Sequence, residues 1–267
     1  MNKVEIKGKK LGHSVEEAYK TLRTNLQFCG EDKKVIAVTS CTPNEGKRNV
    51  TLNLARAFAE AGKKVLVVDA DLRRSVMMGI TEVTQEIKGL SHFLTKQCKM
   101  ADVICATNIR YLHIVYAGPP APNPAELLGN KYFEGLIQTC REVYDYILID
   151  TPPLGSVIDS AVIASQCDGY VIVIESGVIS YRFVKEIKEQ LEKSDCPILG
   201  AILNKVDTSS RRYSGKYYGK YYGKYRSKYY GKYNSYDAYV SEYSASTVSI
   251  ENAQNSFSDK STKASKE

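Results

Sequence analysis

The chain has 267 residues, of which 43% are hydrophobic and 25% are charged, and its formal net charge is +7. This composition is typical of globular proteins and excludes a collagen-like or wholly disordered chain. The apolar runs are far shorter than the roughly 20 residues that cross a bilayer, and the first residues lack the pattern of a secretory signal, so we expect neither a membrane span nor a signal peptide.

Short apolar runs alternate with helical patterns from residue 14 to residue 203. The predicted helices cover residues 14–28, 47–61, 124–142, 156–166 and 179–194. Apolar runs of this kind are typical of strands buried on both faces of a parallel sheet, and they occur at Val35–Ser40, Val65–Asp69, Tyr111–Tyr116, Tyr146–Asp150, Tyr170–Glu175 and Ile198–Leu203. The alternation predicts an α/β fold with a doubly wound, mainly parallel sheet that binds ligands at the carboxyl ends of its strands.

The loop after the first predicted strand has the context of a phosphate-binding loop. VIAVTS runs into CTPNEGKRN and then into a helix. Backbone N–H groups at the start of a helix attract phosphate oxygens, Gly46 would allow a close approach of the backbone, and Lys47 would reach the outer phosphates. A surface lysine after a turn glycine would give the same pair of residues, so the loop alone does not decide the function.

Aspartates follow two further predicted strands. VLVVDADLRR places Asp69, Asp71 and Arg73 at the end of the second strand, and YDYILIDTPP ends in Asp150. Each aspartate alone could be a turn residue or a helix cap. Parallel strands end at one edge of a sheet, however, and phosphate-loop proteins bring carboxylates to Mg²⁺ in this way. Together with the Gly-Lys loop, these residues predict a nucleotide site.

The charge and the tyrosines gather near the C-terminus. Residues 211–243 hold 12 of the 20 tyrosines, and their eight Lys or Arg residues and two acidic residues leave a charge of +6. GKYY-like units repeat every four residues over 215–234, and no aliphatic residue occurs over 209–237. Such a segment cannot form a core, so we expect residues 208–267 to be a flexible, disordered tail.

These motifs resemble those of the bacterial tyrosine kinases that control capsule and exopolysaccharide export. SCTPNEGKRN, VVDADLRRS and ILIDTPPLGS are similar to the family's Walker A, A′ and B motifs, and the resemblance extends over residues 11–207 and into the tail. It implies a P-loop NTPase fold of the deviant Walker type. The implied domains are an N-terminal segment with an interface helix at 1–30, a kinase domain at 31–207, and a tyrosine-rich tail at 208–267.

The resemblance also implies an activity. The chain would be an ATP-dependent, Mg²⁺-using protein-tyrosine kinase that phosphorylates the tail of a neighbouring subunit, with Lys47, Asp71 and Asp69 as catalytic residues. Asp71 and Asp150 are the implied Mg²⁺ ligands. The implied nucleotide-binding residues are Thr42, Pro43, Asn44, Glu45, Gly46, Lys47, Arg48, Asn49 and Asn204, the last at the adenine. The implied phosphate acceptors are Tyr213, Tyr217, Tyr218, Tyr221, Tyr222, Tyr225, Tyr229, Tyr230, Tyr233, Tyr236, Tyr239 and Tyr243.

Residues 15–28, VEEAYKTLRTNLQF, resemble the family's oligomer-interface helix. Glu17, Lys20 and Arg23 occupy the positions of its E-x-x-R-x-x-R pattern, with lysine in place of the first arginine. A solvated amphipathic face is the alternative for this helix. The resemblance implies a homo-oligomeric ring, a transmembrane activator of the polysaccharide export system and a tyrosine phosphatase as partners, and no nucleic acid. It implies a cytoplasmic location, at the inner face of the membrane, where the activator would hold the chain. The seven cysteines are scattered and form no CxxC pair, which favours reduced thiols in a cytosolic compartment and disfavours disulfides and a zinc site.

Arg48 departs from the family's pattern. The family has Ser or Thr directly after the loop lysine, and that hydroxyl binds Mg²⁺, whereas a guanidinium has no lone pair for a metal. Two alternatives therefore stay open: a catalytically impaired nucleotide-binding scaffold of the same export machinery, and a partitioning-type ATPase. The second lacks support at Thr42, where such ATPases carry a lysine. A nucleic-acid-binding role for the tail is a third alternative.

Overall fold

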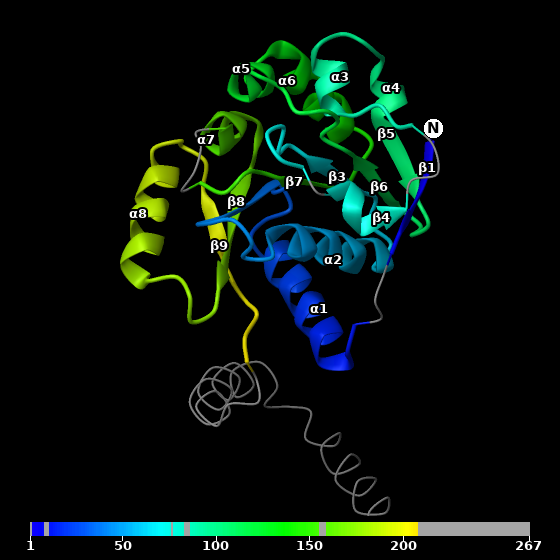
Figure 1. Cartoon of the computed structure of the whole chain (residues 1–267). Coiled ribbons are helices and arrows are strands. Elements are labelled where there is room, and N and C mark those ends of the chain that lie inside the picture. The colour runs from blue at the N-terminus through cyan, green and yellow to red at the C-terminus, as the bar shows by residue number, and fades with distance from the viewer. Residues whose placement is uncertain (1, 8–10, 76, 83–85, 155–158, 208–267) are drawn as a thin grey trace, which may run out of the picture. The chain divides into compact units, whose positions relative to one another are not determined.

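The structure is a computed structural model that describes residues 2–7, 11–75, 77–82, 86–154 and 159–207 (Figure 1). The tail predicted for residues 208–267, with its twelve tyrosines, lies outside the described residues. Among the described residues, no helix has the length and apolar character needed to span a bilayer.

The described residues form short and medium helices around one sheet. The helices are α1 (His13–Gln27), α2 (Lys47–Glu60), α3 (Leu90–Leu94), α4 (Met100–Val103), α5 (Pro124–Leu128), α6 (Lys131–Arg141), α7 (Asp159–Ile163) and α8 (Tyr181–Glu192), with 3₁₀ turns η1 (Met77–Ile80) and η2 (Ala164–Gln166). The strands are β1 (Asn2–Ile6), β2 (Val35–Ser40), β3 (Val65–Asp69), β4 (Thr81–Glu82), β5 (Ile104–Thr107), β6 (Leu112–Val115), β7 (Tyr146–Asp150), β8 (Gly169–Glu175) and β9 (Ile198–Asn204).

The sheet is mainly parallel. Its strand order among the described residues is β4-β1-β5-β6-β3-β7-β2-β8-β9, and only the pairs β1–β4 and β5–β6 are antiparallel. The central strands β3, β7, β2 and β8 are all parallel to one another. The predicted α/β class with a mainly parallel sheet is therefore confirmed.

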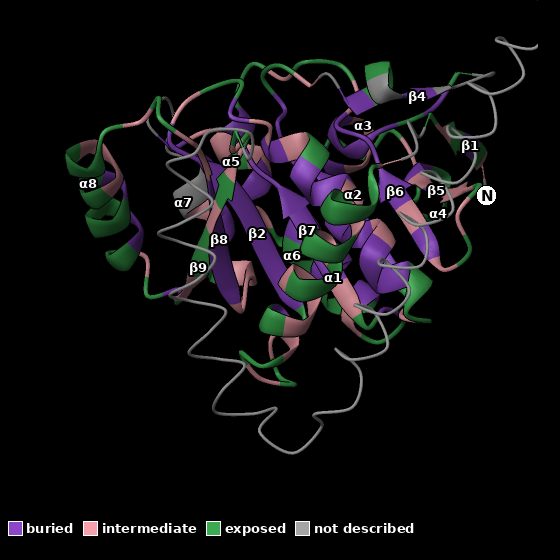
Figure 2. Ribbon diagram, turned by 90° about the horizontal axis from the view of Figure 1, so that it is seen from below, coloured by how far each residue is buried: buried purple, intermediate pink, exposed green. Residues whose placement is uncertain are grey.

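Helices cover both faces of this sheet. Successive strand residues point to opposite sides, and the central strands are apolar at nearly every position, so each face needs a covering layer. Val67 of β3 packs in one apolar cluster with Phe58 of α2, and Leu66 packs in another with Phe133 of α6. Helices α1 and α2 lie on the first face, and α3, α6 and α8 on the second. In Figure 2 the central strands β2 and β7 carry the colour of buried residues, which fits their near-continuous apolar sequences.

One predicted helix is wrong. Residues 124–142 form two helices, because the chain breaks at Gly129 and restarts at Asn130. The Asn130 side chain accepts hydrogen bonds from the backbone N–H groups of Tyr132 (2.9 Å) and Phe133 (3.1 Å), which is the usual way in which asparagine begins a helix. For the helix predicted over 156–166, residues 156–158 lie outside the described part, and the remainder forms α7 and η2.

Three strands were not predicted: β1, β4 and β5. They lie together at one end of the sheet. β1 has the sequence NKVEI, in which only Val4 is buried. β4 has two residues and β5 has four, and such short strands offer neither a long apolar run nor enough alternation to identify them in a sequence. Residues up to Val206, including β1 and α1, belong to one compact unit.

The strand order brings three strand ends to one place. β7 lies between β3 and β2, and in the register of these strands Asp69 pairs with Asp150, and Asp150 pairs with Val38. The carboxyl ends of β3 and β7 therefore lie directly beside the segment that leaves β2 and enters α2. This edge of the sheet holds the residues described next.

Candidate nucleotide-binding site

The loop between β2 and α2 needs a glycine at its end. Gly46 has φ 86° and ψ 14°, in the left-handed region, and a Cβ atom there would lie 2.3 Å from Asn204 Nδ2. Asn204 Nδ2 donates to the Glu45 carbonyl oxygen at 2.8 Å, and Lys205 Nζ donates to the Asn44 carbonyl oxygen at 2.8 Å. The end of β9 thus holds the loop from outside, and Asn204, predicted to contact adenine, contacts the loop backbone.

Glu45 holds the loop from within. Its side chain is buried, and Oε1 accepts from the Thr42 backbone N–H and from Thr42 Oγ1, the latter at 3.0 Å. Oε2 accepts from the Glu175 backbone N–H at 2.9 Å. Every oxygen of this carboxylate therefore has a donor, and the acid shapes the loop and links it to β8.

Lys47 begins α2 and is buried. Its Nζ lies 2.7 Å from Asp150 Oδ1, so the ammonium of the loop and the carboxylate of β7 form an ion pair shielded from solvent. Thr51, one helical turn later, donates from Oγ1 to the Lys47 carbonyl oxygen at 3.0 Å and to Asp150 Oδ1 at 3.4 Å. Sequence reasoning missed Thr51. Its position four residues after Lys47, on the same helix face, is the signal that could have identified it.

Arg48 joins the two strand ends. Its Nη2 lies 3.3 Å from Asp71 Oδ2, and its Nε lies 3.3 Å from Asp150 Oδ2. Nη2 also donates to the carbonyl oxygen of Arg74 at 3.4 Å. The arginine side chain is 16% exposed, against 10% for Asp71 and none for Asp150. The guanidinium is thus largely enclosed between the two carboxylates predicted to bind Mg²⁺.

Asp69 has a different environment from its two neighbours. It is fully buried and accepts hydrogen bonds from Ser75 Oγ and from the Asp71 backbone N–H, the latter at 3.3 Å. Burial, reinforced by the charge of Asp150, raises the pKa of Asp69 to about 7 from an ordinary value of 3.8, against an opposing effect of the Ser75 hydrogen bond. Near neutral pH Asp69 therefore carries less negative charge than an ordinary aspartate would.

The side chains present do not fit a Mg²⁺ ion bound between Asp71 and Asp150. Arg48 stands where a hydroxyl ligand is expected, and each of the four carboxylate oxygens already accepts a hydrogen bond: from Lys47 and Thr51, from Arg48 twice, and from the Arg74 N–H at 3.1 Å. Mg²⁺ needs oxygen ligands at about 2.0–2.1 Å in near-octahedral geometry. Within the described part of the chain, no group of three or more His, Cys, Asp or Glu side chains is placed to hold a metal ion.

The remaining predicted nucleotide-binding residues lie around the loop. Pro43, Asn44 and Asn49 are exposed, and Thr42 is half-buried. Asn44 has a positive φ of 68°, a conformation that asparagine tolerates better than most residues. Sequence reasoning also missed the ion pair of Arg73 with Asp159, whose Nε and Oδ2 atoms lie 2.7 Å apart. That pair ties the segment after β3 to the start of α7.

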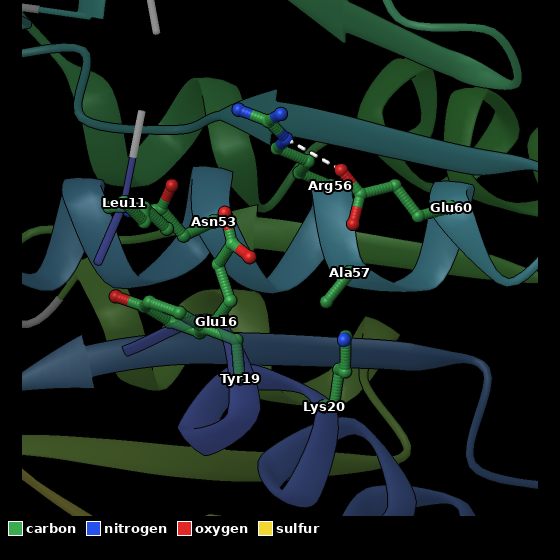
Figure 3. A pocket seen from close by; sticks show the side chains of 8 residues that line it. All are labelled: Leu11, Glu16, Tyr19, Lys20, Asn53, Arg56, Ala57 and Glu60. Carbon is green, nitrogen blue, oxygen red and sulfur yellow. Dashed lines mark hydrogen bonds and ion pairs between the residues drawn. The ribbon is translucent and has the colours of Figure 1, made fainter. Parts of the chain in front are cut away.

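The predicted interface residues lie on α1, away from this cluster. Glu17 and Lys20 form an exposed ion pair of 2.7 Å, whereas Arg23 Nη1 donates to the carbonyl oxygen of Ala57 in α2 at 2.8 Å. A cavity of about 30 Å³ lies between α1 and α2 (Figure 3), lined by Leu11, Glu16, Tyr19, Lys20, Asn53, Arg56, Ala57 and Glu60. It has room for water molecules only, so it is not the nucleotide site.

Comparison with known proteins relates this site to a family. Residues 33–196 match the family model of the AAA domain. The chain is 44% identical over 215 residues to the tyrosine-protein kinase CpsD of Streptococcus agalactiae, a match that covers 80% of this chain and 94% of that protein. It is 38% identical over 190 residues to the tyrosine-protein kinase YwqD of Bacillus subtilis, covering 70% and 80% of the two chains. The kinase domain of the Escherichia coli tyrosine kinase ETK matches with a TM-score of 0.70 and 31% identity over 74% of this chain and 78% of that one.

Proposed function

The chain belongs to the bacterial tyrosine-protein kinases built on an AAA domain, and from this premise we propose that it transfers the γ-phosphoryl group of ATP to tail tyrosines of a neighbouring subunit. The cycle of phosphorylation then regulates capsular or exopolysaccharide synthesis and export. The observation that carries the proposal is the cluster at the start of α2 and the ends of two parallel strands, in which Lys47 pairs with Asp150 and Arg48 joins Asp150 to Asp71.

The loop and α2 bind the nucleotide in this proposal. The first N–H groups of a helix have no partner within the helix, and together with the helix dipole they attract phosphate oxygens. Lys47 turns from Asp150 to the β- and γ-phosphates, while Glu45 keeps the loop in shape through its bonds to Thr42 and Glu175. Phosphoryl transfer depends on such positioning and charge neutralisation more than on covalent chemistry.

Asp71 is the carboxylate that acts on the substrate. Its side chain is 10% exposed, whereas Asp69 and Asp150 are fully buried, so a tyrosine hydroxyl can reach Asp71 only. A free tyrosine has a pKa of about 10, and a carboxylate that accepts or orients its proton therefore favours attack on the phosphate. Asp69 supports Asp71 by accepting its backbone N–H. Because Mg²⁺ does not fit between Asp71 and Asp150 beside Arg48, no step is assigned to it.

The tail supplies the acceptor tyrosines in trans. A tethered tail in a homo-oligomeric ring gives a high local concentration of substrate without strong binding, and Glu17, Lys20 and Arg23 of α1 contribute to the ring contact. Each phosphotyrosine adds about −1.5 to −2 charges at neutral pH. Three or four of them cancel the +6 of residues 211–243 and release the tail from an acidic neighbour.

Further partners follow from the family resemblance. We propose that a transmembrane activator of the polysaccharide export system brings the chain to the inner face of the cell membrane, and that a tyrosine phosphatase resets the tail. Nucleic acid is not among the expected partners. The relatives compared above are named as kinases, and this favours the kinase over the scaffold and over the partitioning-type ATPase.

The test is a complementation of two defective chains. One chain carries Lys47→Met with an intact tail, and the other carries phenylalanine at the twelve tail tyrosines with an intact site; Lys64→Met, on an exposed lysine, is the matched control. Both are incubated with ATP, magnesium and the activator's cytoplasmic segment, and phosphotyrosine is located by mass spectrometry. We expect phosphate on the Lys47→Met tail only in the mixture. Phosphorylation of the Lys47→Met chain alone would exclude this site as the kinase site.

A further inference from the structure

Arg48 lies between the carboxylates of two strand ends, although its position in α2 does not force its side chain to point there. An arginine at the second position of a helix could extend into solvent, yet this side chain is only 16% exposed and contacts the ends of both β3 and β7. It contacts Asp71 Oδ2 and Asp150 Oδ2 at 3.3 Å each, and the Arg74 carbonyl oxygen at 3.4 Å. The guanidinium therefore lies between two carboxylates that a divalent cation would otherwise neutralise.

We propose that Arg48 is a built-in cation of the site, which neutralises Asp71 and Asp150 and contacts the bound polyphosphate, so that the chain binds ATP without a divalent metal. This inference rests on the proposed function, because it assumes that ATP binds at the loop of α2. It concerns the cation on which that binding depends.

The charges of the cluster support this role. Lys47 and Arg48 are paired with Asp71 and Asp150, so the four charges of these ion pairs balance before any metal is added. A serine or threonine in place of Arg48 would leave one positive charge too few, and a cation would then be needed there. With Arg48 present, a divalent ion would meet carboxylates that are already paired with cations, an adjacent guanidinium and carboxylate oxygens that already accept hydrogen bonds. Each of these factors opposes its binding.

The donors of Arg48 also suit a phosphate. A guanidinium has five N–H donors, and the contacts to Asp150, Asp71 and the Arg74 carbonyl oxygen use Nε and Nη2. No hydrogen bond joins Nη1 to any other residue in the described part of the chain, so its two N–H groups are available for a phosphate oxygen. Bonds of this kind between charged groups are about twice as strong as neutral ones. Lysine could supply the charge but not the fork that bridges two strand ends.

The experiment compares nucleotide affinity with and without metal. The full-length chain and its Arg48→Ser, Arg48→Lys and Arg56→Ser variants are titrated with ATP by calorimetry in EDTA and again in magnesium. Arg56 is a partly exposed arginine of the same helix, paired with Glu60, and its variant controls for the loss of an arginine from α2. Thermal melts followed by circular dichroism establish that each variant is folded before it is titrated.

We expect the dissociation constant of the native chain and of Arg56→Ser to change less than threefold between EDTA and magnesium. Arg48→Ser should lose at least tenfold in affinity in EDTA and recover it in magnesium, and Arg48→Lys should lie between them. Electron paramagnetic resonance of Mn²⁺ with ATP gives a second readout, in which the immobilised Mn²⁺ signal should be strong for Arg48→Ser and weak for the native chain.

Two results would overturn the inference in distinguishable ways. If the native chain required magnesium as strongly as Arg48→Ser, Arg48 would not be the cation of the site, while the nucleotide function would stand. If the native chain bound ATP in neither buffer, and Lys47→Met behaved identically, the proposed function would fail together with the inference.

Discussion

Replacing Gly46 by alanine tests whether the phosphate-loop geometry rests on the contact with β9. The residue has φ 86°, and its added Cβ would lie 2.3 Å from Asn204 Nδ2, a distance that real Cβ atoms do not reach. Asn204 must move, and its hydrogen bond of 2.8 Å to the Glu45 carbonyl oxygen is then lost. The substitution should therefore cost stability twice, through the backbone and through Asn204.

The magnitude follows from these two effects. A non-glycine residue in the left-handed region costs about 1–2 kcal/mol, and a lost hydrogen bond costs about 0.5–1.5 kcal/mol, which gives about 1.5–3.5 kcal/mol in all. Gly62 is a matched control, because its φ of 80° is similar but an added Cβ there meets nothing within 4 Å. Gly62→Ala should therefore cost only about 1–2 kcal/mol.

The assay is urea unfolding of the full chain, followed by circular dichroism, for Gly46→Ala, Gly62→Ala, Asn204→Ala and the double variant Gly46→Ala/Asn204→Ala. In the Asn204→Ala background, the cost of Gly46→Ala should fall to that of Gly62→Ala, since no side chain then obstructs the Cβ. ATP affinity should fall for Gly46→Ala and stay unchanged for Gly62→Ala. Equal unfolding costs for the two glycine variants in the native background would refute the reasoning.

Three further predictions concern carboxylates that are buried or half-buried. The pKa of Asp69 is raised to about 7, so between about pH 4 and pH 7 its carboxyl stays protonated in the fold but ionises in the unfolded chain, and stability falls as pH rises through this range. Asp69→Asn should therefore gain stability relative to the native chain as pH rises from 5 to 8 in urea titrations, and parallel pH profiles would contradict this. Glu45→Gln should weaken ATP binding severalfold in calorimetry, because an amide nitrogen must then face one of the donors from Thr42 or Glu175, whereas the exposed Glu31→Gln should not. Asp168 accepts hydrogen bonds from the backbone N–H groups of Lys34 and Val35 and pairs with Arg141 at 2.8 Å. Asp168→Ala should therefore lower the free energy of unfolding by about 2–4 kcal/mol and leave ATP affinity unaltered. A loss of stability no larger than that caused by Asp32→Ala, at an exposed aspartate, would contradict this prediction.

The ends of the central strands could be predicted because the relevant signal is local. VLVVD and YILID are apolar runs that end in an aspartate, and their buried strands β3 and β7 terminate at those residues. Which strands are neighbours could not be predicted in the same way. β7 lies between β3 and β2 in the sheet, although it follows them by about 80 and about 110 residues in the chain. The register that sets Asp69 opposite Asp150 is a property of that long-range pairing.

The details of the site were less accessible. GKYY repeats and a Gly-Lys pair are visible in a sequence, but the burial of Glu45 and the contact of Asn204 with the loop depend on the approach of β8 and β9. The break of the predicted 124–142 helix has a local signal, Gly129 followed by Asn130, which the amphipathic pattern on either side obscures. In each case tertiary packing, or a competing local signal, decided the outcome.

The two cations at the start of α2 are electrostatically unfavourable there unless the carboxylates of the strand ends neutralise them. Lys47 and Arg48 are two consecutive cations in the first turn of a helix that has no acidic residue there, and the helix dipole disfavours positive charge at that end. This unfavourable interaction is offset by Asp150, which forms ion pairs with both Lys47 and Arg48, and by Asp71, which forms an ion pair with Arg48. Removing Asp150 would leave Lys47 without its carboxylate partner and Arg48 with Asp71 alone, whereas a bound polyphosphate would neutralise both cations. The local conflict in α2 is therefore relieved either by the strand ends or by a nucleotide, and this is the electrostatic condition for ATP to compete with Asp150 for Lys47.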